Sequence, residues 1–308
     1  MNILITGGAG FIGSHIADKY IEAGHNVIVV DNLSHGDTKN LNKNCRFYRD
    51  DISAYLDNIF EENKIDVINH HAAQIDLRKS QADPIYDVKI NIEAGISLMN
   101  TAVKYKVKKI IFASSGGAVY GEQKVFPADE SHVTEPLSPY GIDKLAFEKY
   151  LKFYKEYYGM EYVILRYANV YGPRQSLKGE GGVVSVFTKK IIRNETPVIN
   201  GRGDQTRDYV FVDDVASANL SALEYNQSGI FNIATGKETS VNELYEMISE
   251  CSVRQVEAAH AQEIRGEQKR SVLDASKAKE ELNWQAKTDI RNGIKITFDW
   301  FRDNIDRI

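Results

Sequence analysis

The first thirty residues restrict the fold more than any other stretch of the chain. A short apolar run at residues 3–5 is followed by glycines at a spacing of three, Gly7, Gly10 and Gly13. Apolar residues then recur at helical spacing, and a second apolar run ends at Asp31. This pattern predicts a strand, a tight turn, a helix and a second strand, the unit that opens a doubly wound α/β sheet.

A turn of this kind suits a dinucleotide. Glycine lets the backbone turn sharply and lets a pyrophosphate approach the first N–H groups of the helix, where the helix dipole favours negative charge. The carboxylate of Asp31, at the end of the second strand, can accept a hydrogen bond from a ribose hydroxyl and repel a 2′-phosphate. We therefore predict that Gly7, Gly10, Gly13 and Asp31 bind NAD rather than NADP.

The composition excludes several other classes of protein. The 308 residues are 43% hydrophobic and 26% charged, and the net charge of −5 gives no reason to expect a nucleic acid as partner. The two cysteines and seven histidines suggest no disulfide framework and no metal site. The first predicted strand starts at Asn2, and no apolar run approaches the length of a membrane span. We expect no signal peptide, no membrane contact and a cytoplasmic location.

Strands and helices alternate along the rest of the chain. Apolar runs predict strands at residues 45–48, 66–71, 109–113, 162–166 and 229–234, and helical spacing predicts helices at about 83–104 and 140–158. This alternation predicts a Rossmann-like, doubly wound parallel sheet of about seven strands with ligands at the carboxyl ends of the strands. We predict an NAD-binding domain over residues 1–168, to which the chain returns around 209–236, and a smaller mixed α/β substrate lobe over 169–308.

The helix predicted from Tyr140 to Tyr158 carries more apolar surface than one buried stripe requires. Either the smaller lobe covers the excess, or a second copy of the chain does. We favour the second explanation and predict a homodimer that forms through this helix.

Tyr140 and Lys144 lie four residues apart and would share one side of that helix. A phenol with a pKa of about 10 is a poor base at neutral pH. A lysine ammonium on the next turn, together with a positively charged nicotinamide, would stabilise the phenolate. Tyr105 and Tyr120 also precede a lysine by four residues, but only Tyr140 opens a long helix after a proline.

Ser115 follows the strand predicted at 109–113, at the sheet edge where the cofactor should lie. Its hydroxyl could hydrogen-bond the substrate oxygen that Tyr140 deprotonates. The candidate catalytic residues are therefore Ser115, Tyr140 and Lys144.

Motifs occur along nearly the whole chain, including GGAGFIGSH, HHAAQ, SSGGAVYG, SPYGIDK, LRYANVYGPRQ, GRGDQTRDYVFVDDVA and SVLDASKAKEELNW. In these motifs the chain resembles the extended short-chain dehydrogenases/reductases, and among them the UDP-glucose 4-epimerases. The resemblance implies that the following residues also contact NAD, together with Tyr140 and Lys144: Phe11, Ile12, Asn32, Asp51, Ile52, Ala72, Gln74 and Asn91. It further implies that Asn169, Val183 and Arg207 face the nucleotide diphosphate of the substrate. Ser115 and Tyr140 would face the sugar.

The chain departs from the family's pattern at four positions. Ala94 stands where the family often has glycine, Ala168 where phenylalanine commonly precedes an asparagine, and Asn200 where an aromatic ring often stacks on uracil. The tail reads IRGE where the family usually has RPGE. The arginine that holds the pyrophosphate is therefore displaced, and either Arg265 or Arg270 takes its place.

The resemblance implies an NAD-dependent 4-epimerase of a nucleotide sugar, most often UDP-linked, that acts through a transient 4-keto sugar. Related dehydratases and decarboxylases carry an acid directly after the catalytic Ser or Thr, where this chain has Gly116 and Gly117. Two alternatives remain open. One is a UDP-uronic acid 4-epimerase, with Arg174 or Lys178 to meet the carboxylate, and the other is a non-catalytic NAD-sensing protein on the same fold.

Ser271 bears on the size of the substrate. By the resemblance, it falls where epimerases restricted to plain hexoses carry a tyrosine beside the C2 substituent of the sugar. Serine leaves that space open, and its hydroxyl could bond an acetamido carbonyl. We therefore predict that UDP-glucose and UDP-N-acetylglucosamine are both epimerised.

Overall fold

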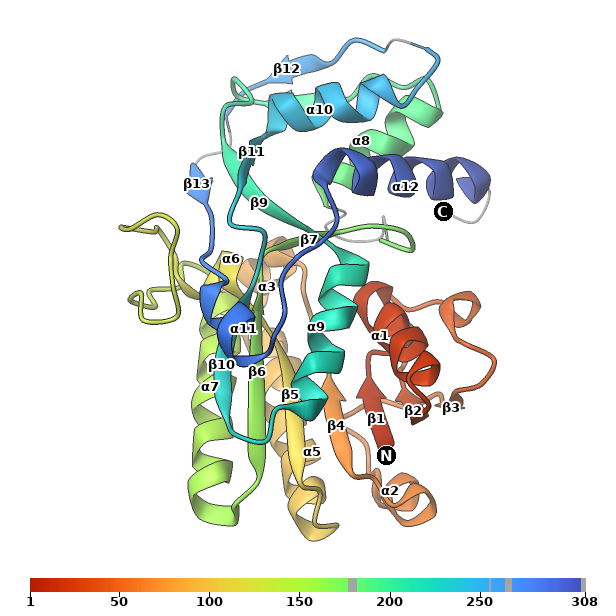
Figure 1. The fold of residues 1–308 in the computed structure, drawn as a ribbon, viewed down its shortest axis with the longest axis vertical. Coiled ribbons are helices and arrows are strands. Elements are labelled where there is room, and N and C mark those ends of the chain that lie inside the picture. The colour runs from red at the N-terminus through yellow and green to blue at the C-terminus, as the bar shows by residue number, and fades with distance from the viewer. Residues whose placement is uncertain (177–181, 255, 264–267, 306–308) are drawn as a thin grey trace.

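A seven-stranded sheet forms the larger part of the molecule (Figure 1). The computed structural model describes residues 1–176, 182–254, 256–263 and 268–305. In chain order the strands are β1 (Asn2–Thr6), β2 (Asn26–Val30), β3 (Arg46–Tyr48), β4 (Val67–His70), β5 (Lys109–Ser115), β6 (Glu161–Tyr167) and β10 (Gly229–Ile233). All neighbours are parallel, in the order β10-β6-β5-β4-β1-β2-β3. The predicted doubly wound parallel sheet is confirmed, and its order reverses between β1 and β4.

Helices cover both faces of this sheet and enclose two separate cores. On one face, α1 (Phe11–Glu22) packs against α9 (Val212–Glu224), and side chains such as Ile3 and Ile5 of β1 join their core. On the other face, α2 (Asp57–Asn63), α5 (Ala94–Lys104) and α7 (Pro139–Tyr158) cover a core that includes Leu4. Because side chains alternate along a strand, one apolar run serves both cores.

The helix predicted at about 83–104 contains an irregularity. It consists of α4 (Pro84–Val88), a π-helical turn at Lys89–Glu93 and α5, and it follows the short helix α3 (Leu77–Ala82). Such turns occur frequently at functional sites. Here Asn91, on the π-helical turn, is directed inward and is only 4% exposed.

The smaller lobe lies beyond the carboxyl ends of the main strands (Figure 1). It contains β7 (Asn169–Tyr171), β8 (Val198–Asn200), β9 (Thr206–Phe211), β11 (Glu238–Ser240), β12 (Ala259–Ala261) and β13 (Arg270–Ser271), with helices α8 (Val183–Ile192), α10 (Val241–Glu250) and α12 (Ile290–Asp303). A third core lies among these elements. Between β13 and α12 the chain returns to the larger part, where α11 (Ser276–Glu281) packs against β10.

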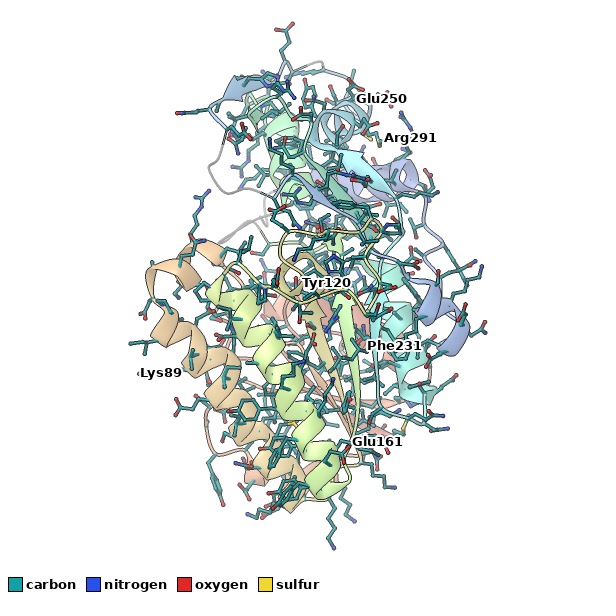
Figure 2. All side chains as sticks on the ribbon, turned by 90° about the vertical axis from the view of Figure 1, so that its left-hand side faces the viewer. Lys89, Tyr120, Glu161, Phe231, Glu250 and Arg291 are labelled. Carbon is teal, nitrogen blue, oxygen red and sulfur yellow. The ribbon has the colours of Figure 1, made fainter. Side chains whose placement is uncertain are left out.

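The apolar excess of α7 is not covered by the smaller lobe. Figure 2 faces this helix and shows the lobe above its upper end. Among the described residues, α7 packs mainly against α3, α4, α5 and the sheet. Phe153, Tyr157 and Tyr158 remain 46%, 75% and 51% exposed. The explanation that the lobe covers this surface is therefore wrong, and the homodimer stays a prediction.

Within the described part of the chain, no helix has the length and apolar character needed to cross a membrane. The same residues contain no group of three or more His, Cys, Asp or Glu side chains that could hold a metal ion.

Candidate active site

The glycine turn between β1 and α1 brings backbone segments unusually close together. Gly7 has φ of 72°, and a Cβ atom there would lie 2.7 Å from the backbone nitrogen of Ala72. A Cβ at Gly13 would lie 2.4 Å from the carbonyl oxygen of Gly7. Gly10 caps α1 without a side-chain hydrogen bond. The first amides of α1 therefore keep their donors for an anion at this end of the helix.

Asp31 lies at the end of β2 and is 8% exposed. One carboxylate oxygen accepts from the backbone N–H of Ala9 (3.0 Å) and the other from that of Leu33 (2.8 Å). Each oxygen retains a second lone pair, so the carboxylate can also accept from a ribose hydroxyl. Asp31 thus supports the glycine turn as well as bordering the pocket.

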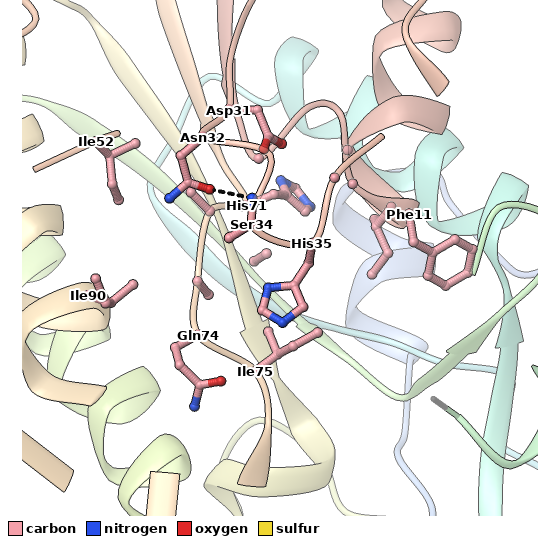
Figure 3. Close-up of a pocket in the computed structure, with 18 of the residues that line it drawn as sticks. Phe11, Asp31, Asn32, Ser34, His35, Ile52, His71, Gln74, Ile75 and Ile90 are labelled. Carbon is pink, nitrogen blue, oxygen red and sulfur yellow. Dashed lines mark hydrogen bonds between the residues drawn. The ribbon is translucent and has the colours of Figure 1, made fainter. Parts of the chain in front are cut away.

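A long pocket crosses the carboxyl ends of the strands where the strand order reverses, and Figure 3 shows its walls. Among the predicted cofactor-binding residues, these line it: Gly7, Gly10, Phe11, Ile12, Gly13, Asp31, Asn32, Asp51, Ile52, Ala72, Gln74, Tyr140 and Lys144. Sequence reasoning missed several others, namely Ser34, His35, His71, Ile75, Lys79, Ile90 and Tyr167.

Asn91 is the predicted cofactor residue that lies behind the pocket wall. Its side-chain oxygen accepts from the backbone N–H of Gln74 (2.9 Å), and its amide nitrogen donates to the carbonyl of Gln74 (3.1 Å). Asn91 therefore positions the loop that lines the pocket.

His71 and Tyr167 contact each other at the base of the pocket. The Nε2 atom of His71 lies 3.0 Å from the hydroxyl of Tyr167, which also accepts from the side chain of Asn219 (2.9 Å). The sequence did contain a pattern that could have indicated this contact. Asn69 and His71 are polar residues two positions apart in an otherwise apolar run, so both face the same side of the sheet.

Two of the candidate catalytic residues, Tyr140 and Lys144, line the pocket, and Ser115 lies beside Tyr140. Tyr140 is in the first turn of α7 and Lys144 is in the next, with the lysine nitrogen 5.7 Å from the centre of the tyrosine ring. The lysine also donates to the carbonyl of Ala113 (2.9 Å). Ser115, at the end of β5, hydrogen-bonds Tyr140. The structure thus brings together the serine, tyrosine and lysine that the sequence singled out.

Burial dominates the electrostatics of this group. It lowers the pKa of Lys144 to about 8, against the opposing effect of the carboxylates of Asp87, Glu148 and Asp143. Burial raises the pKa of Tyr140 well above its ordinary value, Asp87 raises it further, and the hydrogen bond from Ser115 lowers it. Tyr140 by itself therefore keeps its proton at neutral pH, and action as a base requires added positive charge beside it.

The two glycines after Ser115 have different surroundings. A Cβ at Gly116 would lie 2.4 Å from a methyl group of Leu273, whereas a Cβ at Gly117 would lie 3.9 Å from the hydroxyl of Ser115 and 3.8 Å from the side-chain oxygen of Asn169. The side chain of Leu273 would have to move before an acidic side chain could stand at Gly116. Gly117 instead has both the Ser115 hydroxyl and the Asn169 side chain within ordinary contact distance of its missing Cβ.

Apart from Ser115 and Tyr140, the described residues predicted to contact substrate belong to the lobe. Val183 begins α8, and Arg207 of β9 is paired in register with Ser271 of β13. Ser271 is 3% exposed. Arg270 donates twice to Glu238 and stacks on Phe126 at 4.0 Å. Arg265, the other candidate for the displaced arginine, lies outside the described residues.

A parallel sheet with a glycine turn, a strand-end acid and an adjoining serine, tyrosine and lysine defines a protein of the short-chain dehydrogenase/reductase class. Residues 3–234 match the model of the NAD dependent epimerase/dehydratase family, and the chain belongs to that family.

Similar proteins agree with this assignment over the full length of the chain. A putative UDP-glucose 4-epimerase of Methanocaldococcus jannaschii is 48% identical over 98% of this chain and 99% of its own. The crystal structure of UDP-glucose 4-epimerase with UDP-glucose from Thermotoga maritima is 47% identical, with a TM-score of 0.97 over 99% of this chain and 100% of that one. A UDP-N-acetylglucosamine 4-epimerase from Methanobrevibacter ruminantium, in complex with UDP-N-acetylmuramic acid, is 36% identical, with a TM-score of 0.93 over 100% and 99% of the two chains.

Proposed function

We propose that the protein is an NAD-dependent 4-epimerase of UDP-linked hexoses, acting on UDP-glucose and UDP-galactose and on their N-acetyl forms through a transient 4-keto sugar. The observation that carries the proposal is that Ser115 and Lys144 both adjoin Tyr140, and that Tyr140 and Lys144 line the pocket. The similarity to UDP-glucose 4-epimerases over the whole chain supports it.

The pocket fits NAD. The glycine turn has no space for side chains at Gly7 and Gly13, and the first amides of α1 lack a side-chain cap, as a pyrophosphate requires. Asp31 keeps lone pairs for a ribose hydroxyl. When bound, NAD supplies the hydride acceptor and donor that inversion at C4 requires.

We assign the proton chemistry to the catalytic group. Tyr140 accepts the proton of the C4 hydroxyl and returns it after inversion, while Ser115 hydrogen-bonds the same oxygen. The ammonium of Lys144 favours the phenolate form of Tyr140 and holds the ribose near it. On the lobe side, Asn169, Val183 and Arg207 contact the nucleotide diphosphate, which must be held while the sugar turns.

The uronic acid alternative has less support. Arg174, one of the two cations considered for the substrate carboxylate, donates to the carboxylate of Asp18 on α1 at 2.7 Å. The other, Lys178, lies outside the described residues. A non-catalytic NAD sensor would not need the catalytic group at all.

We also propose a cytoplasmic homodimer. The exposed aromatic residues Phe153, Tyr157 and Tyr158 of α7 offer a surface for a second copy. The low cysteine content, two residues in 308, is typical of proteins in a reducing compartment. Light scattering at micromolar concentration tests the oligomeric state, and a monomeric mass would contradict the dimer.

A substrate panel tests the activity. The purified protein, without added cofactor, is incubated with UDP-glucose, UDP-N-acetylglucosamine and UDP-glucuronate, and the products are separated by chromatography. We expect the C4 epimers of the first two and none of the third. Absence of all three epimers, despite NAD in the protein, would refute the proposal.

A further inference from the structure

A buried carboxylate that belongs to neither predicted set of site residues connects the two ends of the pocket. Asp87 lies on α4 and is fully buried. One of its oxygens accepts from the side-chain amide of Gln74 (2.8 Å), and the other from the hydroxyl of Ser80 (2.9 Å). Both donors are neutral side chains, and each occupies one oxygen of the carboxylate.

The bond from Ser80 leads directly to the catalytic helix. The hydroxyl oxygen of Ser80 accepts from the backbone N–H of Tyr140 at 2.8 Å. This N–H belongs to the first turn of α7, whose amides have no partner within the helix. The cap residue Ser138 bonds the N–H of Gly141 instead. The hydroxyl group of Ser80 thus accepts from the N–H of Tyr140 and donates its own hydrogen to Asp87.

The bond from Gln74 leads to the cofactor side of the pocket. Figure 3 shows Gln74 on the loop that borders the pocket, with Ile90 on the helix beside it. The backbone of this loop is fixed by Asn91 on the π-helical turn that follows α4. Asp87 therefore connects the loop that lines the cofactor pocket with the first turn of α7.

We propose that Asp87 is a positioning residue of the active site: through Ser80 and Gln74 it fixes the backbone of Tyr140 relative to the loop that lines the cofactor pocket. The activity part of this inference rests on the proposed function, but the positioning part does not.

The charge of Asp87 has a second effect. From α7, the groups that face it are Tyr140, Asp143 and Lys144, and from α3 and the loop they are the neutral Ser80 and Gln74. The carboxylate raises the pKa of both Tyr140 and Lys144. Removing its charge should therefore move both limbs of the pH–activity profile to lower pH.

The test compares Asp87→Asn with Asp83→Asn. Both are acids on or next to the same helix, and Asp83 is an exposed cap that accepts from the N–H of Tyr86 (3.0 Å). We expect Asp87→Asn to lower kcat by roughly 10-fold or more, with KM for UDP-glucose changed less than about 3-fold, and to move the pH profile to lower pH. We expect faster amide hydrogen exchange in the peptide that contains Tyr140, and less NAD retained per chain. Asp83→Asn should resemble the wild type in each respect.

Ser80→Ala separates position from charge. It removes the acceptor of the Tyr140 amide but keeps Asp87, so amide exchange should become faster while the pH profile stays in place. The proposal is wrong if Asp87→Asn and Ser80→Ala both leave exchange near Tyr140 at the level of Asp83→Asn. If the wild-type protein epimerises no UDP-sugar, the proposed function fails, but amide exchange and NAD content still decide this inference.

Discussion

The cofactor side and the substrate side of the pocket are built differently. The cofactor side consists largely of backbone: a glycine turn, strand ends and a loop held by Asn91, all within the seven-stranded part of the molecule. The proposed substrate side consists of side chains carried by short strands and helices of the lobe, such as Arg207 and Ser271. A backbone site leaves a strong sequence pattern because few residues can adopt it, whereas a side-chain site depends on contacts between distant segments.

The largest effect is expected from a substitution at Tyr140, where the cofactor side and the substrate side meet. Tyr140→Phe removes the proposed base but little volume, so turnover should fall by orders of magnitude while NAD stays bound. Turnover of UDP-glucose and the NAD released on denaturation measure the two effects. Tyr105→Phe is the control, since the hydroxyl of Tyr105 bonds Asp57 and Glu61 far from the pocket. An active Tyr140→Phe protein would refute the mechanism.

On the substrate side, Ser271→Tyr should separate two substrates. Ser271 is buried, so a tyrosine ring in its place would compete for space with the N-acetyl group of a bound substrate. We expect this crowding to weaken binding of that substrate by about 1–3 kcal/mol. We expect roughly a 10- to 100-fold loss of kcat/KM for UDP-N-acetylglucosamine, with UDP-glucose spared. Equal effects on both sugars would show that Ser271 does not control substrate size.

On the cofactor side, Asp31→Ser should weaken NAD binding by about 1–3 kcal/mol, the cost of a lost charge-assisted hydrogen bond. Because Asp31 also holds the backbone at Ala9 and Leu33, a loss of affinity alone does not prove contact with the ribose. The ratio of the dissociation constants for NAD and NADP, measured by fluorescence titration, is the diagnostic quantity. An unchanged ratio would contradict the role assigned to Asp31.

The smallest effect concerns Asp143, which lies on α7 next to Lys144. Burial raises the pKa of Asp143 to about 7, and its neighbour Asp87 adds to the shift. The folded protein thus binds a proton that the unfolded chain has already released, so stability falls as pH rises from about 4 to 7. Asp143→Asn should therefore raise the free energy of unfolding at pH 8 by on the order of 1 kcal/mol, with a smaller gain at pH 5.

Urea denaturation at both pH values measures this difference. Glu156→Gln removes the same charge from an exposed position of α7 and serves as the control. A gain for Asp143→Asn that does not depend on pH would contradict the assignment of the titrating group.

The sequence predicted the sheet and the proximity of Tyr140 and Lys144 because both depend on local patterns. Alternating apolar runs specify parallel strands, and a spacing of four puts Tyr140 above Lys144 on a helix. The contact from Ser80 to Tyr140 joins residues sixty positions apart, and no periodicity records it. Likewise, nothing in the tail motif indicates that Arg270 pairs with Glu238.

The contact between Gly116 and Leu273 links reaction type to a distant part of the chain. Leu273 is 1% exposed and occupies the space where a side chain at Gly116 would begin. Related dehydratases carry an acid at that position, so a single substitution at Gly116 would introduce a steric clash before it introduced new chemistry. On this frame we therefore expect a smaller residue at 273 to ease the introduction of an acid at 116, an effect that can be measured as epistasis between the two sites.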